Sequence, residues 1–226
     1  MKNVAIFGSS GALGTAISNG FTDLGFETIQ VTSGSPRRDF ISTIDNDWVN
    51  LVTKHGKLNS VVWAQGFNQS DSIENFSIEI FNRHIEANVT YILDTMHQLI
   101  SVNAIAEGAR IVVLSSIWQD SARPKKLSYI VSKSALKGLV SSICLDLGAK
   151  GISVNAVLPG VTDTPMTHQN LTAQQISNVV NETPLGRLPS IDDVAKTVIW
   201  LASKSSNGIN GQFITVDNGW TRFRNV

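Results

Sequence analysis

The chain begins with a strand, a glycine-rich turn and a helix in immediate succession, and this order constrains the fold more than any other feature. Residues 3–7 are a short apolar run with β-branched members, and residues 8–14, with three glycines, follow directly. Apolar residues then recur at helical spacing at Ile17, Phe21 and Leu24. Such a turn lets backbone N–H groups approach a pyrophosphate at the positive end of a helix. The unit therefore favours dinucleotide binding over a plain turn.

Strands and helices alternate along the rest of the chain. Apolar runs with β-branched residues predict strands at residues 28–32, 59–64, 110–114, 152–158 and 212–216. Helical periodicity predicts helices at residues 45–54, 77–102, 127–147 and 191–202. No repeat or linker interrupts the pattern. It predicts an α/β fold over residues 1–226, a single-domain Rossmann-like doubly wound parallel sheet flanked by helices.

Two segments depart from the alternation. Residues 33–38 are rich in turn formers and too short for a helix, and residues 39–41 are a candidate for an abbreviated third strand. Residues 162–187 have weak periodicity, with a short helix expected at residues 174–180. Long irregular segments in compact domains often cover substrates, so we expect a lid there.

Composition limits the classes of protein that the chain can belong to. Its 226 residues, 42% hydrophobic and 16% charged, suffice for one sizeable core. Eighteen basic and eighteen acidic residues cancel, which argues against nucleic-acid and acidic-membrane partners. The apolar run at residues 4–7 is too short for a signal-peptide core or a membrane span. We therefore expect a cytoplasmic protein.

Neither cysteine nor histidine points to a metal. The single cysteine, Cys144, lies on the apolar face of the helix expected at residues 127–147, so we expect it to be reduced and buried in the core. The histidines show no paired metal-ligand spacing; they are His55, His84, His97 and His168.

Tyr129 and Lys133 are four residues apart in a predicted helix and therefore share one face. A neighbouring cation favours the phenolate, so we expect the pKa of Tyr129 to fall below its free value of about 10. Such a group can pass the proton that reduction of a carbonyl or oxidation of an alcohol requires. The alternative is a packed ring beside an amine that reaches solvent.

Two other polar positions stand out against apolar surroundings. Asn88 interrupts the apolar face of the helix predicted at residues 77–102, either as a satisfied buried hydrogen-bonding group or as a functional one. Ser115 and Ser116 follow the buried strand at residues 110–114, at the strand end where open α/β sheets place their ligands.

Taken together, these residues resemble the classical short-chain dehydrogenase/reductase family over nearly the whole chain. Four of its motifs occur in order: the nucleotide loop, the helix asparagine, the active-site set and the turn that flanks the nicotinamide carboxamide. They are carried by Gly8, Ala12 and Gly14, by Asn88, by Ser116, Tyr129 and Lys133, and by Pro159, Gly160 and Thr164.

The resemblance implies an NAD(P)(H)-dependent oxidoreductase that acts on a carbonyl or secondary alcohol. Tyr129 would be the proton donor or acceptor, and Lys133 would lower its pKa and hold the nicotinamide ribose. Ser116 would donate a hydrogen bond to the substrate oxygen, and Asn88 would anchor a water that relays protons. The cofactor itself would carry the hydride.

The resemblance also implies a cofactor-binding set. It comprises Gly8, Ser9, Ser10, Gly11, Leu13, Gly14, Ser33, Arg37, Arg38, Asp39, Phe40, Ala64, Gln65, Gly66, Asn88, Tyr129, Lys133, Pro159, Gly160, Val161 and Thr164. The second strand ends without the acidic residue typical of NAD enzymes, and Arg37 and Arg38 suit a 2′-phosphate. We therefore expect NADP, with NAD as the alternative if the two arginines point to water and Asp39 neutralises one of them.

Two positions beside the expected cofactor depart from the family pattern. Phe7 replaces the usual threonine before the first loop glycine, and Ala64, Gln65 and Gly66 replace the usual Asn-Ala-Gly. Loss of a hydroxyl and an amide from neighbouring strand ends is interpreted as a matched apolar replacement, because removing both polar partners costs little. A weakened cofactor site is the alternative.

Other functions remain as alternatives. A non-catalytic dinucleotide-binding regulatory protein would not require Asn88, Ser116, Tyr129 and Lys133 together. A nucleotide-sugar epimerase typically needs a larger C-terminal region, and the glycine-rich turn does not fit the nucleophile elbow of a serine hydrolase.

The substrate and the oligomer are less constrained. The expected substrate wall fits a medium-sized polar carbonyl, such as a 3-oxoacyl thioester or a sugar-like ketone; it contains Phe67, Asn68, Trp118, Gln119, Met166 and His168. Arg123, Lys125 and Lys126 suit either an anionic substrate or a solvated surface. Helices 77–102 and 127–147 are apolar over more than one face, so we expect a homo-oligomer, a tetramer or a dimer.

Overall fold

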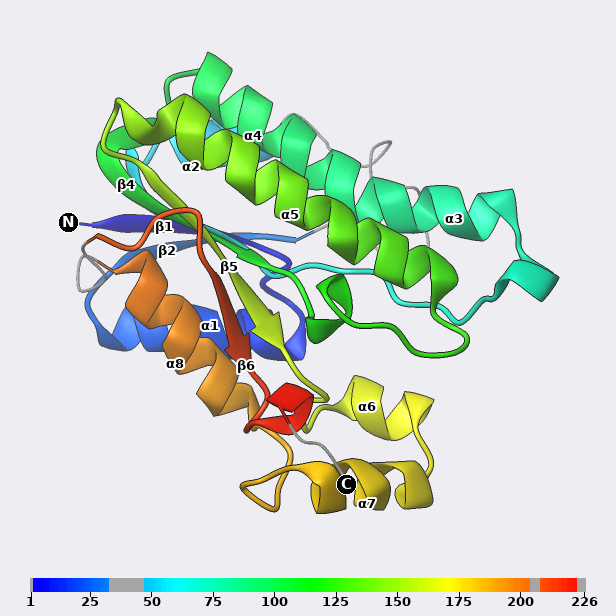
Figure 1. The fold of residues 1–226 in the computed structure, drawn as a ribbon. Helices are drawn as coiled ribbons and strands as arrows, with labels where there is room; N and C mark the ends of the chain where they lie inside the picture. The colour runs from blue at the N-terminus through cyan, green and yellow to red at the C-terminus, as the bar shows by residue number, and fades with distance from the viewer. Residues whose placement is uncertain (1, 33–46, 204–207, 223–226) are drawn as a thin grey trace.

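The computed structural model describes residues 2–32, 47–203 and 208–222 (Figure 1). Within them, parallel strands form one sheet in the order β2-β1-β3-β4-β5-β6. Their bounds are β1 Asn3–Phe7, β2 Glu27–Val31, β3 Leu58–Trp63, β4 Ile105–Leu114, β5 Ser153–Pro159 and β6 Phe213–Val216. The chain starts in β1, adds β2 on one side and then crosses to β3 on the other. The predicted doubly wound sheet is confirmed, whereas the candidate strand at residues 39–41 lies outside the described residues.

Helices cover both faces of the sheet. Helices α2 (Asp47–Thr53), α4 (Tyr91–Ser101) and α5 (Leu127–Gly148) lie on one face, and α1 (Ala12–Asp23) and α8 (Ile191–Ala202) lie on the other (Figure 1). Because side chains alternate along a strand, each inner strand supplies both cores. In β1, Ala5 and Phe7 join the core under α4 and α5, and Val4 and Ile6 join the core over α1 and α8.

The helix predicted at residues 77–102 is confirmed as an unbroken helical segment, but it is not α-helical throughout. Helix α3 (Ile78–Ile85) passes into α4 through a π-helical turn at Glu86–Thr90, and Asn88 lies buried within that turn. Asn88 donates a hydrogen bond to the carbonyl of Phe67 and accepts one from its N–H, so a loop outside the helix uses this amide. Wider turns of this kind are frequent at functional sites.

The segment at residues 162–187 is more regular than its sequence suggests. It contains two helices, α6 (Pro165–Asn170) and α7 (Ala173–Glu182), in place of one short helix at residues 174–180. Thr164 caps α6, and Thr172 forms a reciprocal capping box with Gln175 at the start of α7. These caps explain helices that weak apolar periodicity did not reveal.

Cys144 is only half-buried, contrary to the expectation of a core cysteine. It lies at the margin of the core beneath α5, and its Sγ contacts the carbonyl oxygen of Ser141 at 3.1 Å. The reason is that α5 turns one face to the sheet and leaves the flanks of that face partly open. In the described part of the chain, no helix combines the length and apolar character needed to cross a membrane.

Candidate active site

Ser116 follows the carboxyl end of β4, where the chain leaves the sheet in a short 3-10 turn at Ile117–Gln119. Its hydroxyl oxygen accepts a hydrogen bond from the N–H of Trp118 at 3.3 Å, and the hydroxyl lies close enough to Tyr129 to favour the phenolate. Ser115 points elsewhere, since its Oγ donates to Gln119 Oε1 at 2.9 Å. Of the two adjacent serines, the structure therefore brings Ser116 to the phenol.

Lys133 lies one helical turn after Tyr129 on α5, as the spacing predicts. Its Nζ donates a hydrogen bond to the carbonyl of Leu114 at 2.9 Å and lies 5.8 Å from the centre of the Tyr129 ring. Burial lowers the pKa of Lys133 to about 8, because desolvation disfavours the ammonium.

The expected fall in the pKa of Tyr129 is wrong for this structure. Burial raises the pKa of Tyr129 to about 12, and the neighbouring Ser116 hydroxyl opposes that shift. Desolvation of the phenolate is the largest cause of the shift, and Lys133 is itself desolvated and donates to a backbone carbonyl. Tyr129 is therefore a protonated phenol at neutral pH.

Asn88 connects the loop after β3 to the helix that carries Tyr129. Its Nδ2 donates to the carbonyl of Phe67 at 3.0 Å and to Ser132 Oγ at 2.9 Å, and its Oδ1 accepts from the N–H of Phe67 at 2.8 Å. Ser132 in turn donates to the carbonyl of Tyr129 at 2.8 Å. Asn88 is thus a satisfied buried group that fixes two parts of the site together.

The glycine-rich turn, called the glycine cradle below, packs so closely against neighbouring backbone that two of its positions admit no side chain. Gly8 has a φ of +79°, and a Cβ there would lie 2.6 Å from the backbone nitrogen of Gln65. A Cβ on Gly14 would lie 2.1 Å from the carbonyl oxygen of Gly8. Within the described residues, Ser9 Oγ and both polar atoms of the Gln65 side chain are buried without a hydrogen-bond partner. Buried polar groups normally have partners, so this cradle fits a polar ligand such as a dinucleotide.

The remaining described members of the expected cofactor set lie at the same edge of the sheet. A Cβ on Gly66 would lie 3.4 Å from Asn88 Oδ1 and 3.7 Å from Lys133 Nζ, so Gly66 borders the active-site residues. Ser10, Gly11 and Leu13 belong to the turn and the start of α1, Ala64 follows β3, and Pro159, Gly160, Val161 and Thr164 belong to the end of β5 and the start of α6. The expected members that lie outside the described residues are Ser33, Arg37, Arg38, Asp39 and Phe40.

Comparison with known proteins decides the family. Residues 42–221 match the family model described as enoyl-(acyl carrier protein) reductase. The chain belongs to the classical short-chain dehydrogenase/reductase family. It is thus a member of a family of oxidoreductases.

Relatives in this family cover most of the chain. It is 29% identical to the 3-oxoacyl-[acyl-carrier-protein] reductase FabG of Rickettsia felis over 96% of each protein. It is 31% identical to a 3alpha-hydroxysteroid dehydrogenase of Mediterraneibacter gnavus over 75% of this chain and 68% of that protein. The solved aldohexose dehydrogenase of Thermoplasma acidophilum has the same fold, with a TM-score of 0.87, 24% identity and coverage of 100% of this chain and 96% of that one.

The two departures from the short-chain dehydrogenase/reductase pattern do not compensate for each other. Phe7 stacks on Trp63 with ring centres 5.2 Å apart and meets the edges of Trp48 and Tyr91. Ala64 packs into the core on the opposite face of the sheet. The prediction of a matched replacement is therefore wrong, because alternation along the strands sends the two side chains to different cores.

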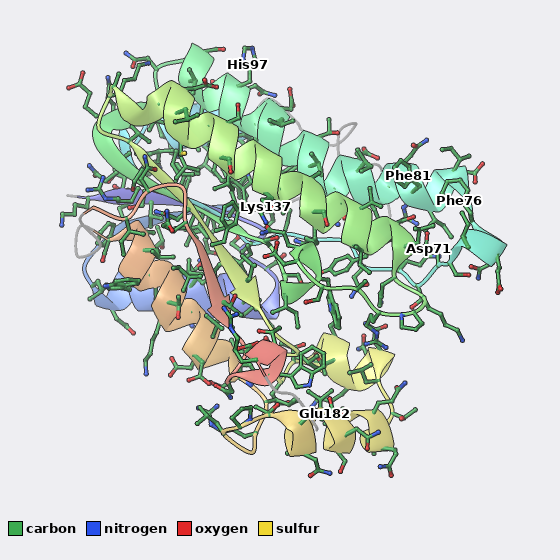
Figure 2. All side chains as sticks on the ribbon, in the orientation of Figure 1. Asp71, Phe76, Phe81, His97, Lys137 and Glu182 are labelled. Atoms are coloured by element: carbon green, nitrogen blue, oxygen red, sulfur yellow. The ribbon has the colours of Figure 1, made fainter. Side chains whose placement is uncertain are left out.

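Sequence reasoning missed Asp71 as a residue of this short-chain dehydrogenase/reductase site. Its carboxylate is 1% exposed and accepts hydrogen bonds from the N–H of Ser128 at 3.0 Å and from the Ser128 hydroxyl, at the N-terminal end of α5 (Figure 2). The contact spans 57 positions of sequence and has no local pattern. Asp71 thereby fixes the start of the helix that carries Tyr129.

Trp220 is a second missed residue. Its ring meets that of Trp118 edge-on with centres 5.7 Å apart, and its Nε1 donates to Glu182 Oε2 at 3.1 Å. It therefore joins the loop after Ser116 to the end of α7. In the described residues, no group of three histidine, cysteine or acidic side chains is arranged to hold a metal ion.

The expected substrate wall is only partly open to a ligand. Phe67 packs against His84 at 4.7 Å, Gln119 is buried and bonded to Ser115, and His168 lies 2.7 Å from Asp163. Asn68, Trp118 and Met166 are the other members of that wall, and Asn68 accepts a hydrogen bond from Lys126 at 2.6 Å.

Proposed function

We propose that this chain is an NAD(P)(H)-dependent oxidoreductase that transfers a hydride between the nicotinamide cofactor and a carbonyl or secondary-alcohol substrate. The observation that carries the proposal is the setting of the Tyr129 phenol: the Ser116 hydroxyl lies close enough to favour its phenolate form, and Lys133 Nζ lies 5.8 Å from its ring centre. These groups lie at the same sheet edge as a glycine cradle with unpartnered polar atoms. Membership of an oxidoreductase family supports the same conclusion.

In this proposal, Ser116 and Tyr129 act on the substrate oxygen. Ser116 donates a hydrogen bond as negative charge develops on that oxygen, where a fixed donor stabilises the transition state most. Tyr129 delivers a proton to the same oxygen during reduction and accepts it during oxidation. Its pKa of about 12 suits the donor role, because the phenol is protonated at neutral pH.

Lys133 and Asn88 support the proton donor. Lys133, with a pKa of about 8, is largely an ammonium at neutral pH and can bind the nicotinamide ribose hydroxyls and return a proton to Tyr129. Asn88 Oδ1 accepts one protein hydrogen bond, and a carbonyl oxygen has two lone pairs, so it can also hold a relay water.

The cofactor supplies the hydride when it is bound. The turn from Gly8 to Gly14 would hold its pyrophosphate at the start of α1, and Ser9 and Gln65 would each gain the hydrogen-bond partner that they lack.

We propose NADP(H) as the preferred cofactor. The second strand ends without an acid to bind a ribose 2′-hydroxyl, and Arg37 and Arg38 follow it with the charge that a 2′-phosphate requires. We expect kcat/KM to be higher for NADPH than for NADH, and Arg37→Ala or Arg38→Ala to reduce that ratio. An outright NADH preference, or a ratio unchanged in both variants, would contradict the assignment.

A medium-sized carbonyl compound is the proposed substrate. The curated relatives are named as a 3-oxoacyl reductase and a hydroxysteroid dehydrogenase, and both names describe compounds with a carbonyl or a hydroxyl group. Residues 162–187 would act as the lid, because Trp220 ties the end of α7 to Trp118 beside Ser116.

We also propose a homo-oligomer, a tetramer or a dimer. Large apolar side chains remain exposed on α4 and α5, as expected of helices that a second copy covers; they are Leu93, Val131 and Leu145. Sedimentation at micromolar concentration would test this, and a clean monomer would contradict it.

The function is tested by Tyr129→Phe, assayed by nicotinamide absorbance on a panel of ketones and alcohols. We expect kcat to fall by about a hundredfold or more, as for loss of a positioned general acid, while cofactor binding by calorimetry changes little. The matched control is Tyr91→Phe, which removes a phenol hydroxyl from α4 in the aromatic cluster around Phe7. Normal turnover by Tyr129→Phe would refute the mechanism. Cofactor binding without turnover of any compound would favour a regulatory protein.

A further inference from the structure

Lys126 points into the protein although its neighbours in the sequence lie in a charged loop. It is 7% exposed, its Nζ donates to Asn68 Oδ1 at 2.6 Å, and the same Nζ lies 6.0 Å from the centre of the Tyr129 ring. Lys125 remains exposed and has a φ of +61°, a left-handed conformation that reverses the chain between the two lysines. Of the two lysines, Lys125 therefore lies on the solvated surface, and Lys126 does not.

Arg123 adds a second cation to the same region. Its guanidinium lies 5.7 Å from the centre of the Trp118 ring, and Trp118 is two residues after Ser116. The two cations are close enough to interact: burial first, and then the charge of Arg123, lower the pKa of Lys126. The pair thus borders the phenol on one side and the loop after Ser116 on the other.

Within the described residues, no carboxylate forms an ion pair with either cation. The acid whose charge Lys126 feels is Asp71, and its two carboxylate oxygens accept hydrogen bonds from the N–H and the hydroxyl of Ser128. An ammonium has three N–H donors, and Asn68 is the one described acceptor of Lys126. Because the Asp71 carboxylate is engaged by Ser128 and forms no ion pair with Lys126, a ligand oxygen that carries negative charge would satisfy the remaining N–H donors of this desolvated ammonium.

We propose that Lys126 and Arg123 form a subsite that recognises an anionic group of the substrate, a carboxylate or a phosphate, beside the carbonyl that Tyr129 protonates. The proposal rests on the oxidoreductase function and narrows its substrate class. The subsite is separate from the cofactor cradle, whose unpartnered groups are Ser9 and Gln65. Arginine and lysine both suit such anions through charge-assisted hydrogen bonds.

The test compares charged and neutral forms of one carbon skeleton. Linear oxo acids with one to four methylene groups between ketone and carboxylate are assayed beside their methyl esters, and dihydroxyacetone phosphate beside dihydroxyacetone. We expect at least one anion to exceed its neutral counterpart in kcat/KM by about tenfold or more, as for one charged hydrogen bond. Added salt should reduce that advantage.

Variants of the two cations test whether the preference for anions arises at this subsite. Lys126→Gln and Arg123→Gln should each lower the anion-to-neutral ratio by about tenfold, and Lys126→Arg should retain most of it. Lys125→Gln is the matched control, since it removes the same charge one residue away on the exposed side; its ratio should stay within about twofold of wild type. Arg123 is only half-buried, so Arg123→Gln keeps the test valid if Lys126→Gln fails to fold.

Two outcomes separate this proposal from the proposed function. If neutral ketones are reduced and the anions gain nothing, or if the ratio is unchanged in both glutamine variants, the anion subsite is wrong and the oxidoreductase stands. If nothing in the panel is reduced, a thermal-shift measurement with the same oxo acids tests the subsite by itself. An oxo acid that binds there should raise the melting temperature of the wild type and not of Arg123→Gln. A shift that is equal in both proteins, or absent from both, would refute it.

Discussion

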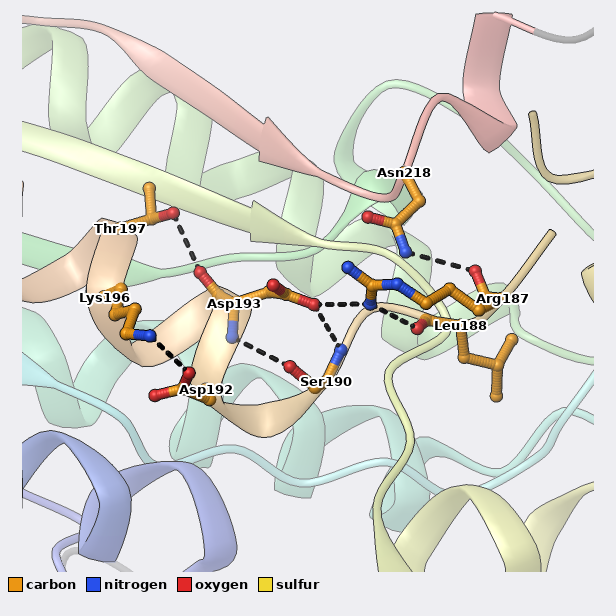
Figure 3. A network of polar contacts seen from close by, with 8 residues as sticks. All are labelled: Arg187, Leu188, Ser190, Asp192, Asp193, Lys196, Thr197 and Asn218. Carbon is orange, nitrogen blue, oxygen red and sulfur yellow. Dashed lines mark hydrogen bonds and ion pairs between the residues drawn. The ribbon is translucent and has the colours of Figure 1, made fainter. Parts of the chain in front are cut away.

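Two carboxylates in this protein hold the beginning of a helix, and they do so in opposite surroundings. Asp71 is buried, and it binds the N–H and hydroxyl of Ser128 at the start of α5 across 57 positions of sequence. Asp193 lies within its own helix, α8, with its side chain 34% exposed. It accepts the N–H of Ser190 at 2.8 Å and pairs with Arg187 at 2.7 Å, while Ser190 Oγ accepts the N–H of Asp193 at 3.0 Å (Figure 3).

The comparison shows how burial changes the value of the same interaction. Around Asp193, water can replace a lost partner, and Arg187 retains its second hydrogen bond, to the carbonyl of Leu188 (Figure 3). Around Asp71, no water would reach the N–H and hydroxyl of Ser128, so losing the carboxylate would leave both groups unsatisfied. The buried cap also lies one residue before Tyr129, whereas the exposed cap supports α8, which belongs to the scaffold.

The largest expected effect is that of Asp71→Ala. We predict a loss of about 3 kcal/mol in the free energy of unfolding, because two buried donors lose an acceptor at once. Turnover should fall as well, since the start of α5 positions Tyr129. Urea unfolding and kcat measure the two effects. Asp71→Asn is the control, because it keeps one acceptor oxygen. A loss below about 1 kcal/mol in Asp71→Ala would show that burial does not make the Asp71 cap more stabilising than the Asp193 cap.

The smaller effect belongs to Asp193→Ala, for which we predict about 1 kcal/mol at neutral pH, the usual value of a lost cap, reduced by solvent screening. Turnover should change little, because α8 carries none of the proposed catalytic groups. A loss of unfolding free energy equal to that of Asp71→Ala would show that the buried and the exposed cap contribute equally to stability.

The exposed cap formed by Asp193 also leads to a prediction about how stability depends on pH. The hydrogen bond with Arg187, followed by those with Ser190, holds the pKa of Asp193 well below its usual range. A lowered folded-state pKa stabilises the protein at pH values above the unfolded pKa of about 4, and this contribution is lost as the pH falls through the folded-state value. The stability difference between wild type and Asp193→Asn should therefore shrink in acid. A difference that stays constant from neutral pH to about pH 3 would contradict this assignment.

The features that the sequence predicted correctly depend on neighbours along the chain. The order of strands and helices, the shared face of Tyr129 and Lys133, and the capped helix α8 follow from spacing and local hydrogen bonding, which act within a few residues. The same local character explains why the π-helical turn at Asn88 was missed: the loop that binds this amide is 21 positions away.

Only the tertiary structure decided the properties that depend on what surrounds a group. The direction of the pKa shift at Tyr129, the inward position of Lys126 and the cap from Asp71 all arise from burial among segments distant in the sequence. Desolvation depends on how closely those segments pack, and the order of residues alone does not give that distance. The sequence thus determined which chemical groups meet on α5, and the packing of the loops around α5 determined their charge and their partners.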